Sequence, residues 1–439
     1  MKDILPGSGS SIPTDPVAHK GILYFNPACF ESALWRSDGT AEGTYEVATF
    51  PGSWRGHGDP GKVLPFGDEL AVFVFEGNRS YSLWMSDGTR AGTRHVKGGF
   101  IQPDTPSFPF IEDDESSYAI QIFGPAAVVG RNLYFSADGG DGAGRELWRS
   151  DGTAAGTRRI SDLAEGSTPS HPSKFSAVPG GLAFVTHTPG RSPTLHHVDD
   201  ATGQIVELRS FRQIGTGYAH GATVYFGAQT ARGAGQELWR TDGTPAGTRQ
   251  VAVRHSWRNR VGWIEWLGVA GPHLYFQSGG SDALRTNSPG LRTIDRRGRV
   301  RRVSDSDAID SFFGVSVGKR LLFSQDLGHG IHELWTSAGT PKTTRRIARV
   351  RGSAGHHRGF GWATSHGRRR AYFTFVERGE KVTLWRTDGT RRGTGRVRAA
   401  GPKIDGNLED LTSLEDALVF TAPVGEFGQE LLIHRTREP

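Results

Sequence analysis

Four histidines in two neighbouring stretches of the chain form a pattern that could bind a metal. His329 and His332 stand in one expected connection between strands, and His356 and His357 stand in the next. We expect both connections to lie on one face of the fold, so that the four side chains approach one another. Imidazole nitrogens bind Zn, Cu, Ni or Fe, and an open site of this kind activates water. No cofactor is otherwise expected, and a divalent metal is the candidate ion.

Tryptophan and arginine gather in the same class of connection, and they indicate binding. An indole ring can stack on a sugar, and a guanidinium can hold an anion through paired hydrogen bonds. The same side chains could equally pack over a neighbouring sheet. The candidate ligand-binding residues are Trp54, Arg55, Trp257, Arg258, Trp263 and Trp362.

Acid–base groups lie in these stretches too, and they keep an enzyme open as the alternative. Such an enzyme would be a lyase, hydrolase or cyclase. The nucleophile elbow, the phosphate-binding loop and the His-Glu-x-x-His zinc motif are all absent from the sequence. We therefore expect a binding scaffold first, whose partner is a saccharide, a peptide or a protein. The candidate catalytic residues are His57, His255, Glu265, His356 and His357.

Net charge bears on the class of partner, and the cysteine content bears on disulfide bonds. The net charge is +6, but the excess is mostly arginine spread along the chain, so it fits a solvated surface as well as an anionic partner. The basic stretch 292–302 has no interleaved aromatic residues, so nucleic acid is not expected. One cysteine, Cys29, excludes an internal disulfide, and no apolar run is long enough for a transmembrane helix.

The elements that must position these residues come from one repeated phrase. Residues 146–157 read Glu-Leu-Trp-Arg-Ser-Asp-Gly-Thr-Ala-Ala-Gly-Thr, and 237–248 are nearly identical. Glu-Leu-Trp-Arg predicts a strand with large side chains on both faces. Asp151 is expected to cap a tight turn in which Gly152 has a positive φ, and the next strand begins at Arg158. Further copies lie at 34–44, 83–93, 334–344 and 384–394.

A second strand, typified by Leu133-Tyr134-Phe135, precedes most copies, and a looser apolar strand precedes that. Units of four strands recurring about every 50 residues are typical of a β-propeller. Two units are degenerate, with His196 and Arg285 at the place of the tryptophan. We predict one all-β propeller domain, most consistent with nine blades and otherwise eight. The expected blades are 13–50, 59–98, 118–163, 172–210, 214–254, 261–304, 311–350, 359–399 and 409–436 plus 1–5, with a long inter-blade insertion at 98–117.

The repeated phrase resembles the Glu-Leu-Trp-x-x-Asp-Gly-Thr-x-x-Gly-Thr repeat proteins of myxobacteria and other bacteria, over nearly the whole chain. Residues 2–11 resemble the inter-repeat segment of that family. The resemblance implies the repeat architecture, and it implies export or attachment to the cell surface if a leader has been trimmed.

Both ends of the chain carry expectations of their own. The last unit has three strands, and residues 2–4 stand where its fourth would be, so the N-terminal strand is expected to complete the C-terminal blade. A ring closed in this way needs no partner copy, and we expect a monomer. Residues 1–7 have no apolar core of signal-peptide length, which predicts a cytoplasmic protein if the chain is complete.

Overall fold

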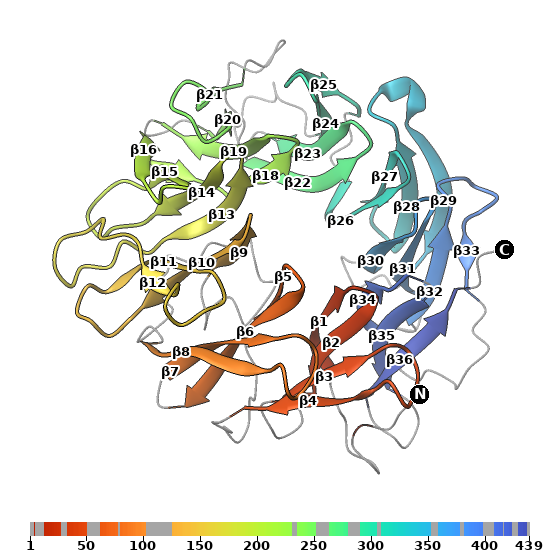
Figure 1. Ribbon diagram of the computed structural model, residues 1–439. Coiled ribbons are helices and arrows are strands. Elements are labelled where there is room, and N and C mark those ends of the chain that lie inside the picture. The colour runs from red at the N-terminus through yellow and green to blue at the C-terminus, as the bar shows by residue number, and fades with distance from the viewer. Residues whose placement is uncertain are drawn as a thin grey trace. The chain divides into compact units, whose positions relative to one another are not determined.

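The computed structural model is an all-β chain built from short antiparallel strands (Figure 1). It describes residues 4, 13–27, 33–50, 62–77, 80–101, 125–230, 235–251, 263–279, 290–304, 309–352, 359–377, 382–397, 408–415, 417–423 and 429–436. Within these ranges the only helix is one 3₁₀ turn, η1 (Pro341–Thr343), and no helix there could span a membrane.

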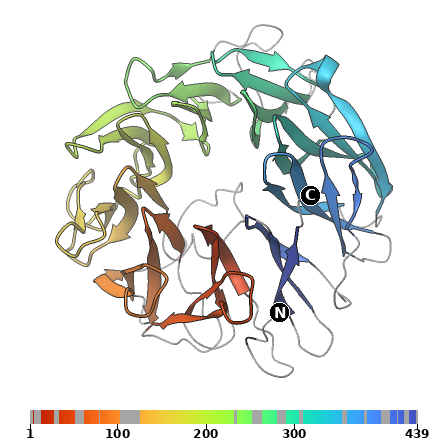
Figure 2. The ribbon, with the colours of Figure 1, turned by 45° about the vertical axis from the view of Figure 1, so that its right-hand side comes forward.

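The chain divides into two compact units. The first comprises Met1–Leu5, Ser10–Gln213 and Thr241–Thr248, and the second comprises Pro6–Gly9, Ile214–Arg240 and Arg249–Pro439. Figure 2 shows the same ribbon from a second direction.

Sixteen strands belong to the first unit, and within each four-stranded repeat successive strands pair with one another. They are β1 (Pro13–His19), β2 (Ile22–Pro27), β3 (Ala33–Ser37), β4 (Tyr45–Thr49), β5 (Val63–Phe66), β6 (Glu69–Gly77), β7 (Ser80–Ser86), β8 (Arg94–Ile101), β9 (Ala126–Val129), β10 (Asn132–Asp138), β11 (Arg145–Ser150), β12 (Arg158–Arg159), β13 (Ser173–Val178), β14 (Gly181–Thr186), β15 (Thr194–Asp199) and β16 (Ile205–Ser210). The repeats β5–β8 and β9–β12 form one sheet because Ile101 of β8 pairs with Asp138 of β10.

The second unit repeats the pattern. β17 (Gln213–Ile214) lies at the boundary between the two units. The strands after it are β18 (Tyr218–His220), β19 (Thr223–Gln229), β20 (Glu237–Thr241), β21 (Arg249–Gln250), β22 (Trp263–Ala270), β23 (His273–Gly279), β24 (Gly290–Asp295), β25 (Val300–Arg302), β26 (Ile309–Val317), β27 (Arg320–Asp326), β28 (Ile331–Ser337), β29 (Arg345–Arg351), β30 (Phe360–His366), β31 (Arg370–Val376), β32 (Val382–Thr387), β33 (Gly395–Arg396), β34 (Glu409–Ser413), β35 (Ala417–Pro423) and β36 (Gln429–Arg435). The last three form a three-stranded sheet.

The Asp-Gly-Thr phrase folds into the predicted turn, held by its own side chains. Asp151 Oδ1 accepts hydrogen bonds from the backbone N–H of Thr153 at 2.9 Å and from its hydroxyl at 2.7 Å. Thr157 donates its hydroxyl to the Thr153 carbonyl at 2.6 Å, and Gly152 has a φ of 88°. Equivalent contacts to the aspartate recur at Asp38, Asp87, Asp242 and Asp388. The phrase therefore has a structural role in every copy that carries the aspartate.

The copy that lacks the aspartate has also lost a glycine. A Cβ on Gly156 would lie 2.0 Å from Asp151 Oδ1, so the aspartate requires glycine at that place. In the copy with Ala338, Thr343 replaces this glycine, and its Oγ1 accepts the Thr340 N–H at 3.2 Å. The threonine supplies the acceptor that the aspartate supplies elsewhere.

In two repeats the tyrosine of the second strand links the repeat to the turn of the next. Tyr134 of β10 donates its hydroxyl to Asp200 Oδ1 at 2.7 Å, and Tyr275 of β23 donates to the Ser337 carbonyl at 3.1 Å. Burial raises the pKa of both phenols, that of Tyr275 to about 12, so both hydroxyls keep their protons at neutral pH. These contacts join successive repeats within each unit.

Two sequence expectations about strand position are wrong. The third strand of the sixth repeat is β24 and not the stretch at Arg285; Arg292 pairs with Phe276 there, as Trp148 pairs with Phe135. The insertion does not begin at residue 98, because 98–101 continue β8 and Phe100 is fully buried against Phe135 and Trp148 at ring distances of 5.3 and 5.2 Å. Residues 102–124, and residues 1–12 apart from Ile4, lie outside the described ranges.

Candidate functional site

Most of the residues predicted to bind or catalyse fall outside the described part of the chain. The enzyme alternative and most of the aromatic binding site therefore stay predictions. The residues concerned are Trp54, Arg55, His57, His255, Trp257, Arg258, His356 and His357.

Trp263 and Glu265 lie in strand β22 and not in a loop as predicted. The Trp263 ring covers Gly279 of β23, where a Cβ would lie 2.7 Å from the indole. Glu265 is half-buried and pairs with Gln277 across the two strands. The aromatic and β-branched residues of β22 favour a strand at this place.

Trp362 is the predicted ligand-binding residue that stands out on the surface. Its side chain is 52% exposed on β30, the first strand of its sheet. It lies where the register of β30 against β31 shifts between Phe360 and Ala363. Such a bulge re-aims the side chains that it carries.

The two described members of the predicted metal site differ in their surroundings. His332 is 2% exposed, its ring lies edge-on to Phe360 and Phe375, and its Nδ1 is 3.8 Å from Asp326 Oδ1. His329 is exposed and has a φ of 53°. Among the described residues no three His, Cys, Asp or Glu side chains gather closely enough to hold a metal ion. A site that includes His356 and His357 stays a prediction.

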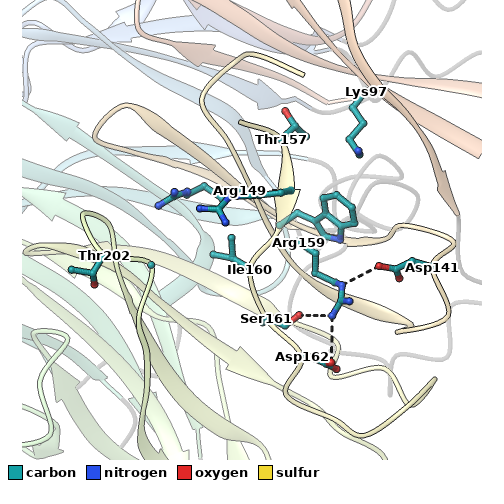
Figure 3. Close-up of a pocket in the computed structure, with 12 residues that line it drawn as sticks. Lys97, Asp141, Arg149, Thr157, Arg159, Ile160, Ser161, Asp162 and Thr202 are labelled. Atoms are coloured by element: carbon teal, nitrogen blue, oxygen red, sulfur yellow. Dashed lines mark hydrogen bonds and ion pairs between the residues drawn. The ribbon is translucent and has the colours of Figure 1, made fainter. Parts of the chain in front are cut away.

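An open pocket of about 560 Å³ lies beside β12 in the first unit (Figure 3). β12 is the end strand of its sheet and pairs only with β11. The lining residues come from β8, from the β11–β12 hairpin and the segment after it, and from two loops. They are Lys97, Asp141, Trp148, Arg149, Thr157, Arg158, Arg159, Ile160, Ser161, Asp162, Thr202 and Gly203.

Both carboxylates of the pocket are engaged by Arg159. Its Nε lies 3.2 Å from Asp141 Oδ2, and its Nη1 lies 3.6 Å from Asp162 Oδ2. Nη1 also donates to the Ser161 carbonyl at 3.0 Å. The backbone N–H of Ala143 and then the Arg159 charge lower the pKa of Asp141, so this carboxylate is ionised at neutral pH. Arg159 is thus fixed in place and neutralised.

Three further cations in the pocket form no ion pair with any described carboxylate. The Lys97 ammonium lies 5.6 Å from the centre of the Trp148 ring, and Arg149 donates to the Asp200 backbone carbonyl at 3.3 Å. Arg158 is exposed on β12. The pocket therefore presents surplus positive charge, which attracts an anionic group.

Sequence reasoning missed this pocket. The sequence indicates Arg158 and Arg159 only as the start of a strand, and Lys97 carries no motif. The surplus charge depends on which arginines form ion pairs in the folded chain, and these pairs cannot be predicted from the sequence.

Comparisons with known proteins identify no family. No family model matches the chain, and no curated protein matches it. Among solved structures it is similar to the tricorn protease, with 13% identity, a TM-score of 0.32, and coverage of 98% of this chain and 40% of that one. It is also similar to a puromycin hydrolase (14%, TM-score 0.40, 84% of this chain and 59% of that one). A third is the β-propeller domain of the Trilobed protease from Pyrococcus furiosus (11%, TM-score 0.38, 72% and 95%).

The chain thus spans less than two thirds of the length of the tricorn protease and of the puromycin hydrolase. At identities and TM-scores this low, these likenesses carry no argument about what the chain binds or catalyses.

Proposed function

We propose that this chain is a binding protein that holds a partner carrying anionic groups, and that the pocket beside β12 is its binding site. The observation that carries the proposal is the surplus of cations there: Lys97, Arg149 and Arg158 form no ion pair with a described carboxylate, although the Arg149 charge also helps to lower the pKa of Asp151. The partner would be an acidic saccharide, an acidic peptide or an acidic patch of a protein.

Three other repeats support this choice of site, because a cation on the fourth strand of each is neutralised by a glutamate of the same repeat. Arg94 of β8 pairs with Glu69, Arg346 of β29 with Glu333, and Arg396 of β33 with Glu377 at 2.6 Å. The β12 pocket departs from that pattern. Cations without an ion-pair partner bind carboxylate, sulfate or phosphate through charge-assisted hydrogen bonds.

We also propose that the repeats are propeller blades, nine in number, with residues 1–5 completing the last one. The repeated four-stranded sheets and the tyrosine contacts between successive repeats support this architecture. A scattering profile of the purified chain with the dimensions of a closed disc would support it, and an elongated array would exclude it.

The binding proposal is tested with a charge-removing double variant, Lys97→Gln with Arg158→Gln. Titration calorimetry at low salt would use two probes, a hexaglutamate peptide and an oligogalacturonate of equal charge. We expect the wild-type chain to bind at least one of them, and we expect the double variant to bind it roughly tenfold or more weakly, because each lost charge-assisted contact is worth about 1 kcal/mol or more.

The matched control is Arg391→Gln with Arg392→Gln, which removes the same charge from an exposed turn in the second unit. It should bind like the wild type. Equal losses in the two double variants would mean that only net charge matters, and no binding of either probe would exclude the proposal.

A further inference from the structure

The backbone of β12 offers a hydrogen-bonding edge inside this pocket with which no described strand pairs. Ile160 donates its N–H to the Leu147 carbonyl of β11 at 2.9 Å. Backbone groups alternate in direction along a strand, so the N–H and carbonyl of Arg159 point away from β11. The register agrees, since Arg159 is paired with Trp148 and Arg158 with Arg149. Arg159 therefore presents a donor and an acceptor to whatever fills the pocket.

The cations of the pocket lie on both faces of the sheet. Arg159 and Trp148 share one face as a cross-strand pair, and Lys97 lies over the Trp148 ring on that side. Arg158 and Arg149 share the other face. Figure 3 shows Arg149 and Thr202 to one side of β12, and Lys97 with Asp141 to the other. The pocket wraps around the edge of the sheet.

We infer that the ligand of this pocket is an acidic peptide in extended conformation, which adds as a further strand along β12. Successive side chains of a strand point to opposite faces, so neighbouring acidic residues would reach Lys97 on one face and Arg149 with Arg158 on the other. Its backbone would pair with the N–H and carbonyl of Arg159. A sugar ring lying on one face would meet only one set of cations. This inference rests on the proposed function and names its partner class.

The test uses three forms of one acidic peptide, an acetylated and amidated hexapeptide of alternating Glu and Asp. One form is unmodified, one is N-methylated at every second residue, and one is N-methylated at all central residues. Alternate methylation leaves one edge of the peptide able to pair, whereas full methylation blocks both edges. We expect the first two forms to bind with similar affinity and the third to bind at least tenfold more weakly. Slower hydrogen exchange at the Arg159 amide on binding of the unmodified peptide is the second readout.

The outcomes separate the inference from the proposal beneath it. If the fully methylated peptide binds as tightly as the unmodified one, while Lys97→Gln with Arg158→Gln still weakens both, the anion pocket stands and strand addition is wrong. Unchanged exchange at the Arg159 amide in the peptide complex would overturn strand addition in the same way. If oligogalacturonate binds and the unmodified peptide does not, the partner is a saccharide. If no acidic probe binds, the proposed function fails with the inference.

Discussion

At the scale of single residues, the turn shows that two positions five apart are coupled. A carboxylate at Asp151 fills the space that a Cβ on Gly156 would need, with only 2.0 Å between them. The repeat with Ala338 carries Thr343 instead of glycine, and the threonine hydroxyl satisfies the turn. The chain thus contains two forms of the same turn, one with aspartate and glycine and one with alanine and threonine. The residue at the first position determines which residue fits at the second.

We predict that Gly156→Thr destabilises the chain strongly and that adding Asp151→Ala recovers part of the loss. The clash disappears with the carboxylate, and the threonine hydroxyl replaces the lost acceptor. The coupling free energy should be on the order of 1–2 kcal/mol, as found for residues in contact. Urea unfolding of the two single variants and the double variant measures it. Additive effects would show that Ala338 and Thr343 are unrelated.

Residue identity also explains which site residues the sequence could not place. Trp263 and Trp362 have the same type and a similar context, yet one covers Gly279 and the other is 52% exposed. His332 packs against two phenylalanine rings, one of which, Phe375, lies on a strand distant in sequence. These tertiary neighbours decide how exposed each side chain is. The polar and aromatic residues expected in loops are therefore candidates, and the sequence does not show which of them form a site.

At the scale of elements, the tyrosine of the second strand joins one repeat to the next. Tyr134 donates to the carboxylate of Asp200, which also accepts from Asn132 at 2.9 Å. We predict that Tyr134→Phe lowers the free energy of unfolding by roughly 1.5–3 kcal/mol, because a half-buried hydrogen bond to a charged group is lost.

Tyr24→Phe is the matched control. Tyr24 packs its hydroxyl end beside Gly88 of the following turn and makes no hydrogen bond to a described residue. Tyr24→Phe should therefore lower the free energy of unfolding by less than about 0.5 kcal/mol. Similar losses in both variants, measured by urea unfolding, would mean that ring packing and not the hydrogen bond links the repeats.

The strands were the most predictable elements. Alternating large residues located β10 and β11, and the turn residues located the hairpin after β11. The sixth repeat was misplaced because it has no tryptophan, and Arg292 occupies that place in β24. Where the tryptophan is missing, the position of the third strand depends on which residues pair with the second strand. In this repeat β23 pairs with Gly290–Asp295.

At the scale of the whole molecule, histidines with lowered pKa values contribute to the response to acid. Burial lowers the pKa of seven described histidines, to about 4 for His187 and His196. The neutral form is favoured in the folded chain, whereas the unfolded chain takes up protons near the ordinary pKa of 6.5. The stabilisation is therefore complete above about 6.5, declines as pH falls, and is lost by about pH 4.

We predict that His196→Gln reduces this pH dependence. His196 is 7% exposed, stacks on Phe184 and bonds to Thr186 Oγ1 at 3.0 Å, so its protonation is strongly disfavoured in the fold. One such group contributes a slope of at most about 1.4 kcal/mol per pH unit. Urea unfolding between pH 7 and pH 4.5 measures the slope of the free energy of unfolding against pH. In the variant this slope should be smaller, by an amount that corresponds to at most one proton taken up on unfolding. Identical slopes in the variant and the wild type would mean that other groups control the acid response, since a variant that is merely less stable shifts the curve without flattening it.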